Sequence, residues 1–378
     1  MTRMSRTRDA VSLGLTIGIV CLFTAGSVQA QQTWTFTTCG ETGRTGPDQS
    51  MCDTAYGATS LDGAVTVTGG IQAWTVPVSG TYRIEAWGAA GGTQIFDTGF
   101  AGGRGAYIAG DFDLAGGETI YVIVGQMGGD TREDAGSGGD IDNAGPGGGG
   151  GSFVYRDATD PFPLVAAGGG GAGGRCSSVA ASLRDGSAGE DGNRGGSVDN
   201  GGLDGNGGTS NAGGSSYWAG GGAGWLTDGT GGNNLTDYYY PLDPNDAGGG
   251  DAETGEGGRA PRNGAIGGLR WDDGLDEGGD GGFGGGGGGG SDNMGGGGGG
   301  GFSGGGGSRY DPCENEPGGG GGSYNGGINA TNTAGVNTGA GSVVITTAAT
   351  QVPTLSEFGL LIMTLLLAAA GFVAAKLA

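Results

Sequence analysis

The chain contains no histidine, and its only lysine is Lys376, close to the C-terminus. Acid–base catalysis by imidazole and Ser–His–Asp triads both need histidine, so both are excluded. A Schiff-base lysine and the phosphate-binding Gly-x₄-Gly-Lys loop need a lysine that the body of the chain lacks. We therefore expect a protein that is not an enzyme. The remaining alternative is an envelope hydrolase, because 39 Asp and Glu residues are present and glycoside hydrolysis needs only two carboxyl groups.

Basic residues are also scarce: 16 Lys and Arg face 39 acidic residues, a net charge of −23. Nucleic acid is bound by basic stripes, so we expect no nucleic-acid partner. Acidic clusters could bind Ca²⁺ through oxygen ligands, although they match neither the EF-hand loop nor the glycine–aspartate repeat. We favour a solubilising role for them and predict no cofactor. These clusters are Asp140 and Asp142, and Asp272, Asp273, Asp276, Glu277 and Asp280.

Proline is rare (11 residues) whereas glycine is abundant (102 residues), without the Gly-X-Y period that collagen requires. The glycines concentrate between about residues 145 and 324, in runs such as Gly284–Gly290 and Gly295–Gly301. Such a tract can be a flexible spacer. Alternatively, because glycine has no Cβ, its runs can pack side by side as polyglycine II helices that bond to their neighbours. Ordering costs roughly 1–2 kcal/mol per residue, so composition leaves both alternatives open.

Tryptophans recur within the tract at Trp218, Trp225 and Trp271. They could stack on a glycan or a protein partner, but we favour small cores at the ends of glycine helices. Regular glycine-helix faces also suggest an alternative function, the binding of ice or polysaccharide.

Long apolar runs occur only at the two ends of the chain. Arg3, Arg6 and Arg8 precede the apolar stretch Val11–Ala25, and Val28-Gln29-Ala30 matches a small-x-small cleavage site. Residues 1–30 are therefore predicted to be an export signal, cleaved between Ala30 and Gln31. The run Phe358–Ala375 predicts a transmembrane helix within the tail 358–378, after a linker over 348–357.

Export places the cysteines in an oxidising compartment, where disulfides form. Cys39 and Cys52 flank a short turn-rich segment, so we expect them to pair locally. Cys176 and Cys313 would then pair by default and close the glycine tract. Cys21 would leave with the export signal, and zinc bound by the four remaining thiolates is disfavoured, because no C-x₂-C spacing occurs.

Between these ends, the pattern predicts β-structure and no helix. Several stretches alternate with period two, as in Tyr82–Ala86. Eight short strands and a return strand near the end of the domain (31–347) suggest an all-β sandwich of jelly-roll type. The candidate strands are 34–38, 64–68, 71–76, 81–87, 106–112, 119–124, 152–156, 163–167 and 342–346.

The tail carries Val352-Pro353-Thr354-Leu355-Ser356-Glu357-Phe358-Gly359. This stretch resembles the Ile-Pro-Thr-Leu-Ser-Glu-Trp-Gly motif of the IPTL-CTERM sorting signal of Gram-negative bacteria, with Val and Phe replacing Ile and Trp. The resemblance implies recognition by an exosortase-type enzyme and sorting to the cell envelope or surface. The protein would be anchored in the membrane before any processing of the tail.

Residues 35–47, 70–92 and 148–154 resemble, in order and spacing, the glycine-rich extracellular domain of anaplastic lymphoma kinase and leukocyte tyrosine kinase. The similarity continues through 163–168 and around Phe283 and Tyr324. It implies a tumour-necrosis-factor-like sandwich carrying an inserted array of polyglycine II helices, and so favours the ordered alternative. No kinase accompanies these residues, so ligand binding does not transfer to particular positions. We expect an exported, envelope-anchored, non-catalytic module that is structural or binds a protein or glycan ligand.

Overall fold

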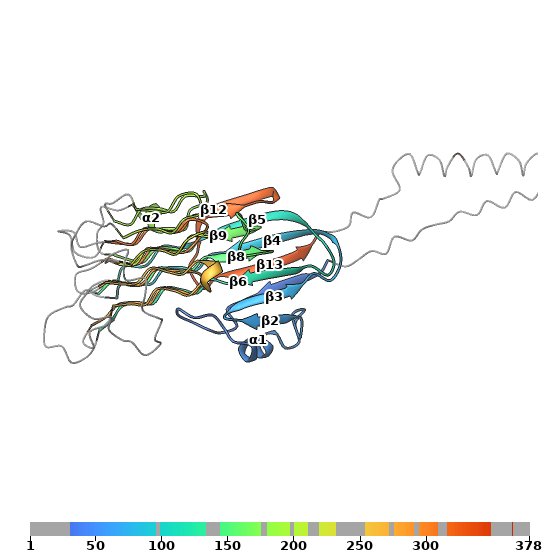
Figure 1. Ribbon diagram of the computed structural model, residues 1–378, viewed down its shortest axis with the longest axis horizontal. Helices are drawn as coiled ribbons and strands as arrows, with labels where there is room; N and C mark the ends of the chain where they lie inside the picture. The colour runs from blue at the N-terminus through green and yellow to red at the C-terminus, as the bar shows by residue number, and fades with distance from the viewer. Residues whose placement is uncertain are drawn as a thin grey trace, which may run out of the picture. The chain divides into compact units, whose positions relative to one another are not determined.

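The computed structural model describes residues 31–95, 99–133, 144–174, 180–196, 200–210, 219–231, 254–271, 276–290, 295–308, 316–348 and Leu365. Residues Gln31–Ala348 form one compact unit built on two antiparallel sheets (Figure 1). The first sheet has the order β1 (Thr33–Phe36), β13 (Ser342–Thr347), β4 (Gly80–Trp87), β5 (Gly105–Leu114) and β12 (Ile328–Asn337). The second has the order β11 (Tyr324–Asn325), β9 (Val165–Ala167), β8 (Ser152–Tyr155), β6 (Thr119–Ile123), β3 (Ile71–Thr75) and β2 (Val65–Thr68).

The main core lies between these two sheets. On β4, Tyr82, Ile84 and Ala86 are buried, whereas the residues between them are half-buried on the outer face. This alternation places one face of the strand against the second sheet. Trp34 of β1 and Trp74 of β3 meet across the core with ring centroids 5.0 Å apart. The expected sandwich of antiparallel strands is thus confirmed at the level of an all-β fold.

The first and last strands lie side by side. β1 pairs with β13, with Trp34 opposite Ile345, and β13 pairs with β4, with Ile345 opposite Ile84. All nine predicted strands are present, with ends shifted by up to two residues. Sequence patterning missed β12, β11 and the small pair β7 (Arg132–Glu133) with β10 (Asp276–Glu277).

The expectation of no helix is wrong, because α1 spans Gln49–Tyr56. The side chain of Asp48 caps it by accepting a bond from the Met51 amide (2.8 Å). Eight residues are too few to show a clear helical period. Two shorter elements also occur, α2 (Ala181–Arg184) and the 3₁₀ turn η1 (Pro261–Asn263).

Helix α1 carries Cys52, which forms the predicted disulfide with Cys39, their Cα atoms 4.9 Å apart. The loop closed by this bond contacts distant glycine-rich segments: the amide of Phe283 donates to the Gly43 carbonyl (2.8 Å), and that of Gly267 donates to the Arg44 carbonyl (2.9 Å). The disulfide loop therefore fixes part of the sandwich against those segments. Cys176 and Cys313 lie outside the described residues, so their pairing stays a prediction.

Glycine segments outside the strands run side by side beyond one end of the sheets (Figure 1). We call them the glycine array: glycine-rich residues within 88–92, 102–105, 125–129, 145–151, 168–173, 219–224, 284–290, 295–301, 304–307 and 318–322. Their backbone bonds join segments that are far apart in the sequence. The amide of Gly148 donates to Gly287 (2.9 Å), that of Gly287 to Gly298 (2.8 Å), and that of Gly298 to Gly220 (2.9 Å). These bonds satisfy backbone groups that no strand pairs.

The segments approach one another too closely for side chains. A Cβ on Gly287 would lie 2.1 Å from the Gly220 carbonyl oxygen, and a Cβ on Gly298 would lie 2.1 Å from the Gly305 carbonyl oxygen. The array also includes glycines before the expected insertion at 145–324, such as Gly91, whose amide donates to the Gly103 carbonyl (3.0 Å). Extended backbone continues from β4, β5 and β6 beyond the sheets, so these segments can pack against the others.

A second core lies where the six-stranded sheet meets the array. Trp225, Phe283 and Phe302 from glycine-rich segments pack with Phe153 and Tyr155 of β8. Trp225 is fully buried and donates its indole N–H to the Asp160 carbonyl (2.8 Å). The predicted core role of Trp225 is confirmed. Trp271 is half-buried, and Trp218 lies outside the described residues.

Among the described residues, no helix has the length and apolar character needed to cross a membrane. Apart from Leu365, the apolar run Phe358–Ala375 lies outside them, so its transmembrane role stays a prediction.

Candidate functional site

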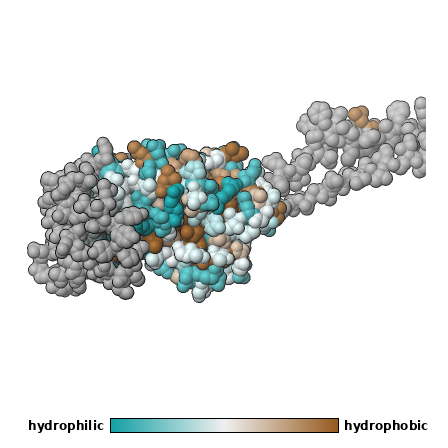
Figure 2. Space-filling model, in the orientation of Figure 1, coloured by the Kyte–Doolittle hydropathy of each residue, from teal (hydrophilic) through white to brown (hydrophobic). Residues whose placement is uncertain are grey.

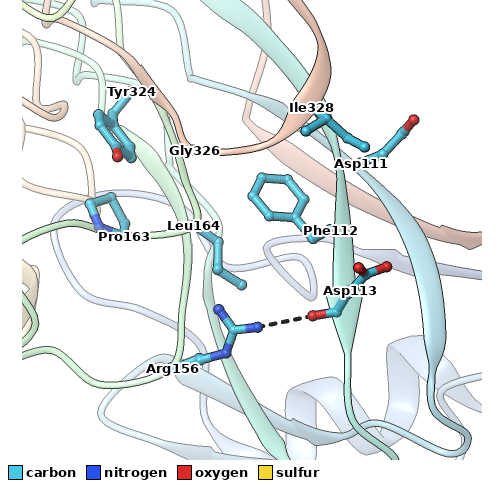
Figure 3. A pocket seen from close by; sticks show the side chains of 9 residues that line it. All are labelled: Asp111, Phe112, Asp113, Arg156, Pro163, Leu164, Tyr324, Gly326 and Ile328. Carbon is cyan, nitrogen blue, oxygen red and sulfur yellow. Dashed lines mark hydrogen bonds between the residues drawn. The ribbon is translucent and has the colours of Figure 1, made fainter.

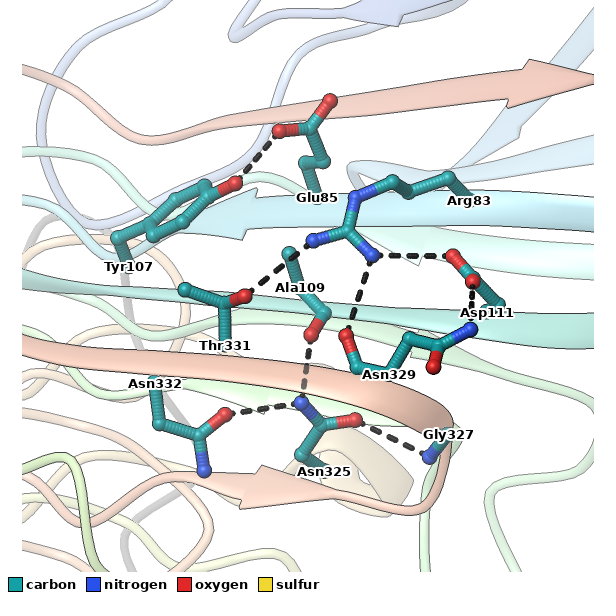
Figure 4. Close-up of polar contacts among 10 residues, drawn as sticks. All are labelled: Arg83, Glu85, Tyr107, Ala109, Asp111, Asn325, Gly327, Asn329, Thr331 and Asn332. Carbon is teal, nitrogen blue, oxygen red and sulfur yellow. Dashed lines mark hydrogen bonds and ion pairs between the residues drawn. The ribbon is translucent and has the colours of Figure 1, made fainter. Parts of the chain in front are cut away.

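A polar network on the sandwich surface joins three distant segments at one edge of the five-stranded sheet (Figure 4). Arg83 on β4 donates to the Asp111 carboxylate on β5 (3.0 Å) and to the backbone carbonyl of Asn329 on β12 (3.3 Å). The Asn329 side chain in turn donates to the other oxygen of Asp111 (2.8 Å). The network therefore ties the start of the edge strand β12 to the two strands inside it.

Charge and hydrogen bonding in this network stabilise the ionised forms of both charged groups. The bond from Asn329 and the nearby Arg83 guanidinium lower the pKa of Asp111, and the bond to Asp111 raises the pKa of Arg83. A carboxyl group held ionised in this way is a poor general acid near neutral pH. Asp111 therefore lacks the property that a glycosidase acid needs.

Further contacts hold β12 along its length. Asn325 donates to the Ala109 carbonyl and to the Asn332 side chain, both at 2.8 Å. At the far end, the Asn337 side chain donates to the carbonyls of Gly88 (2.7 Å) and Ala340 (2.8 Å). Asparagine side chains thus replace the apolar contacts that usually fix a strand, which is why hydrophobic alternation does not reveal β12.

An open groove of about 400 Å³ lies beside this network (Figure 3). Phe112 and Ile328 lie on one side of it, and Leu164 and Pro163 on the other. Arg156 reaches across its lower end and donates to the Asp113 backbone carbonyl (3.2 Å). Apolar side chains line the groove together with the charged residues Asp111, Asp113 and Arg156, so it is mixed in polarity and lacks the mainly apolar lining of a typical small-molecule pocket.

Aromatic rings extend the groove along the surface. Tyr324 lines it and forms a three-ring cluster with Phe162 and Phe302. The ring centroid of Tyr324 lies 5.1 Å from that of Phe162 and 4.9 Å from that of Phe302, and those of Phe162 and Phe302 are 6.0 Å apart. Phe162 is 53% exposed. Figure 2 shows that apolar residues on the visible face form small separate patches among hydrophilic ones, so this face carries no broad hydrophobic surface.

The acidic residues and motifs singled out in the sequence do not belong to this network or to the groove beside it. Asp280 bonds Arg270, accepting from its backbone amide (3.0 Å) and from its guanidinium (3.4 Å). Asp276 and Glu277 lie on β10. Asp140, Asp142, Asp272, Asp273, Ala30 and the motif Val352–Gly359 lie outside the described residues. In the described part of the chain, no group of three or more His, Cys, Asp or Glu residues could hold a metal ion.

Comparisons with known proteins give two findings, a family motif in the tail and a partial similarity to a receptor. Residues 350–376 match the IPTL-CTERM motif. The expected sorting signal is therefore present, and it points to an exported, surface-sorted bacterial protein. The presence of this sorting signal in the tail is in line with recognition of the protein by an exosortase-type enzyme.

A stretch of 100 residues of this chain is similar to the leukocyte tyrosine kinase receptor of Mus musculus, with 42% identity. The match covers 26% of this chain and 11% of the receptor, so the chain spans about a tenth of that relative. The suspected resemblance to this receptor family is thus found independently. What the receptor's name says of kinase activity belongs to that protein.

Proposed function

We propose that the protein is an exported, surface-sorted structural module without catalytic activity, held in the envelope by its tail. In this proposal, the sandwich is a tumour-necrosis-factor-like jelly roll and the glycine array is a bundle of polyglycine II helices. The adjacent first and last strands, β1 and β13, are in line with the jelly roll. Bonds from each glycine segment to several neighbours are in line with the helix bundle.

One observation carries the structural role: the backbone bonds of the array connect segments rather than closing within them. Gly298, for example, donates to Gly220 and accepts from Gly287, so one segment is tied to two others. A tract bonded in this way resists bending and extension, unlike a glycine–serine linker. The array would therefore act as a rigid part that holds the sandwich at a fixed geometry on the cell surface.

The scarcity of catalytic side chains supports the non-catalytic role. The chain has no histidine, and its one lysine lies in the tail. In this proposal the run Phe358–Ala375 anchors the protein in the membrane until an exosortase-type enzyme recognises Val352–Gly359. Binding of ice or polysaccharide stays a prediction.

Surface labelling tests this function. The full chain, expressed in a Gram-negative host that carries an exosortase, is labelled on intact cells beside a variant with Pro353→Ala, Thr354→Ala and Leu355→Ala. We expect surface signal from the natural protein and its loss from the variant, because the apolar run is kept and only the motif changes. Equal surface signals would contradict sorting by the motif, and hydrolysis of a polysaccharide panel by the purified protein would contradict the absence of catalysis.

A further inference from the structure

Strand β12 forms an outer edge of the five-stranded sheet (Figure 1). Residues Ile328–Ala334 on it are all exposed. Natural proteins protect such edges with charged residues, proline or very short strands. β12 is ten residues long, and its sequence, INATNTAGVN, holds neither a charge nor a proline. Register shifts, which also protect edges, interrupt this strand, so the edge is open to pairing with another strand only where its register is regular.

The regular part of this edge is short and sharply bounded. The register against β5 is continuous over Thr331, Asn332 and Thr333, with shifts before Thr331 and after Thr333. Asn329 (φ 52°) and Gly335 (φ 58°) are left-handed and lie three residues on either side of Asn332. Gly335 also donates to the Gly186 carbonyl (3.2 Å), which ends the free edge. A partner strand therefore finds one regular stretch, centred on Asn332.

The sequence of that stretch reads the same in both directions: Ala330-Thr331-Asn332-Thr333-Ala334. An antiparallel partner with this same sequence, aligned on Asn332, would place Thr331 opposite Thr333 of the partner subunit, and Ala330 opposite Ala334 of the partner subunit. Cross-strand threonine pairs stabilise sheets, and a two-fold axis requires such self-complementarity. The occupant that fits best is a second copy of this chain.

Local charge does not oppose this pairing. Two carboxylates near the strand are paired with guanidinium groups, Asp111 with Arg83 and Asp185 with Arg104, and Glu85 accepts a bond from the Tyr107 hydroxyl (2.6 Å). The Arg83–Asp111–Asn329 network and the Asn337 bonds hold β12 in place before any partner arrives (Figure 4). An ordered edge loses less conformational entropy on association than a flexible one. Repulsion from the net charge of −23 acts at longer range and is screened by salt.

We propose that the protein forms a two-fold symmetric dimer in which the β12 strands of two copies pair antiparallel about Asn332. The outer face of the five-stranded sheet then continues across both copies, with Thr331 and Thr333 at the junction. On the cell surface, this pairing would join two anchored copies through their sandwiches and leave the glycine arrays free of the interface.

Charge substitutions at the two threonines test the register directly. Sedimentation velocity of the full chain in density-matched detergent, over a wide concentration range, compares the natural protein with two variants. Thr331→Glu with Thr333→Glu places like charges opposite each other in the dimer. Thr331→Glu with Thr333→Lys places opposite charges there. Both variants share Thr331→Glu beside Arg83, so they differ only at position 333.

We expect a concentration-dependent dimer of the natural protein, and a dissociation constant about tenfold or more higher for the Glu–Glu variant. The Glu–Lys variant should dimerise at least as well as the natural protein, which shows that both positions tolerate charge in the folded state. A natural protein that stays monomeric at every concentration would leave the edge to a foreign strand and overturn the proposal. Equal dimerisation by all three proteins would place the interface elsewhere and also overturn it.

Discussion

Replacing Gly298 by alanine should lower the free energy of unfolding by about 3 kcal/mol or more. A Cβ at this position would lie 2.1 Å from the Gly305 carbonyl oxygen and 2.8 Å from the Gly222 amide nitrogen. Both contacts are with backbone, which cannot rotate away as a side chain can. The neighbouring segments would have to separate, with loss of the bonds from Gly298 to Gly220 and from Gly287 to Gly298.

Gly189→Ala is the matched control. A Cβ at Gly189 would meet only the Ser187 hydroxyl oxygen, at 3.7 Å. The substitution has the same chemistry and the same effect on the unfolded chain, so the stability should change by less than about 0.5 kcal/mol. Urea unfolding followed by tryptophan fluorescence measures both variants. Equal losses in the two variants, or none at Gly298, would mean that the array is not closely packed.

Replacing Phe283 by alanine should cost about 3–5 kcal/mol, the range for a buried aromatic residue. Its side chain is fully buried, and a Cβ added to Gly46 or Gly70 would lie 2.6–2.7 Å from its ring. The ring thus fills the space between the disulfide loop, the six-stranded sheet and the glycine array. Its loss would leave a cavity where these three parts meet.

Phe162→Ala is the comparison for this prediction, because the Phe162 ring is 53% exposed although it stacks against Tyr324 and Phe302. It should cost about 1 kcal/mol. Thermal unfolding of the two variants under identical conditions measures the difference. Similar losses would show that the junction around Phe283 contributes no more than a surface ring pair does.

The strands that face the core could be predicted because their residues alternate, as Tyr82, Ile84 and Ala86 do on β4. β12 could not, because its contacts come from asparagines such as Asn325 and Asn337 that bond to distant backbone. The candidate site could not be predicted either, because it also depends on contacts between segments that are distant in the sequence. Arg83, Asp111 and Asn329 are brought together by strand register, and no spacing in the sequence places them near one another.

The sequence alone did not decide whether the glycine tract is ordered or flexible, for a different reason. A glycine run carries no periodic pattern, and its bonds go to segments far away, as Gly148 bonds Gly287. Only the aromatic residues gave a local indication, and Trp225 and Phe283 do lie at the junction where such residues were expected. The resemblance to a receptor's glycine-rich domain added what composition could not supply.

Amide hydrogen exchange of the full chain tests the central claim most directly, that backbone bonds between glycine segments hold the array together. The amides of Gly297, Gly298 and Gly299 each donate to another segment, at 2.8–2.9 Å. We expect their exchange to be slowed by a factor on the order of 10³ or more relative to a free glycine peptide, comparable to the core strands β4 and β6. Exchange at the rate of the free peptide, while β4 and β6 stay protected, would contradict the account.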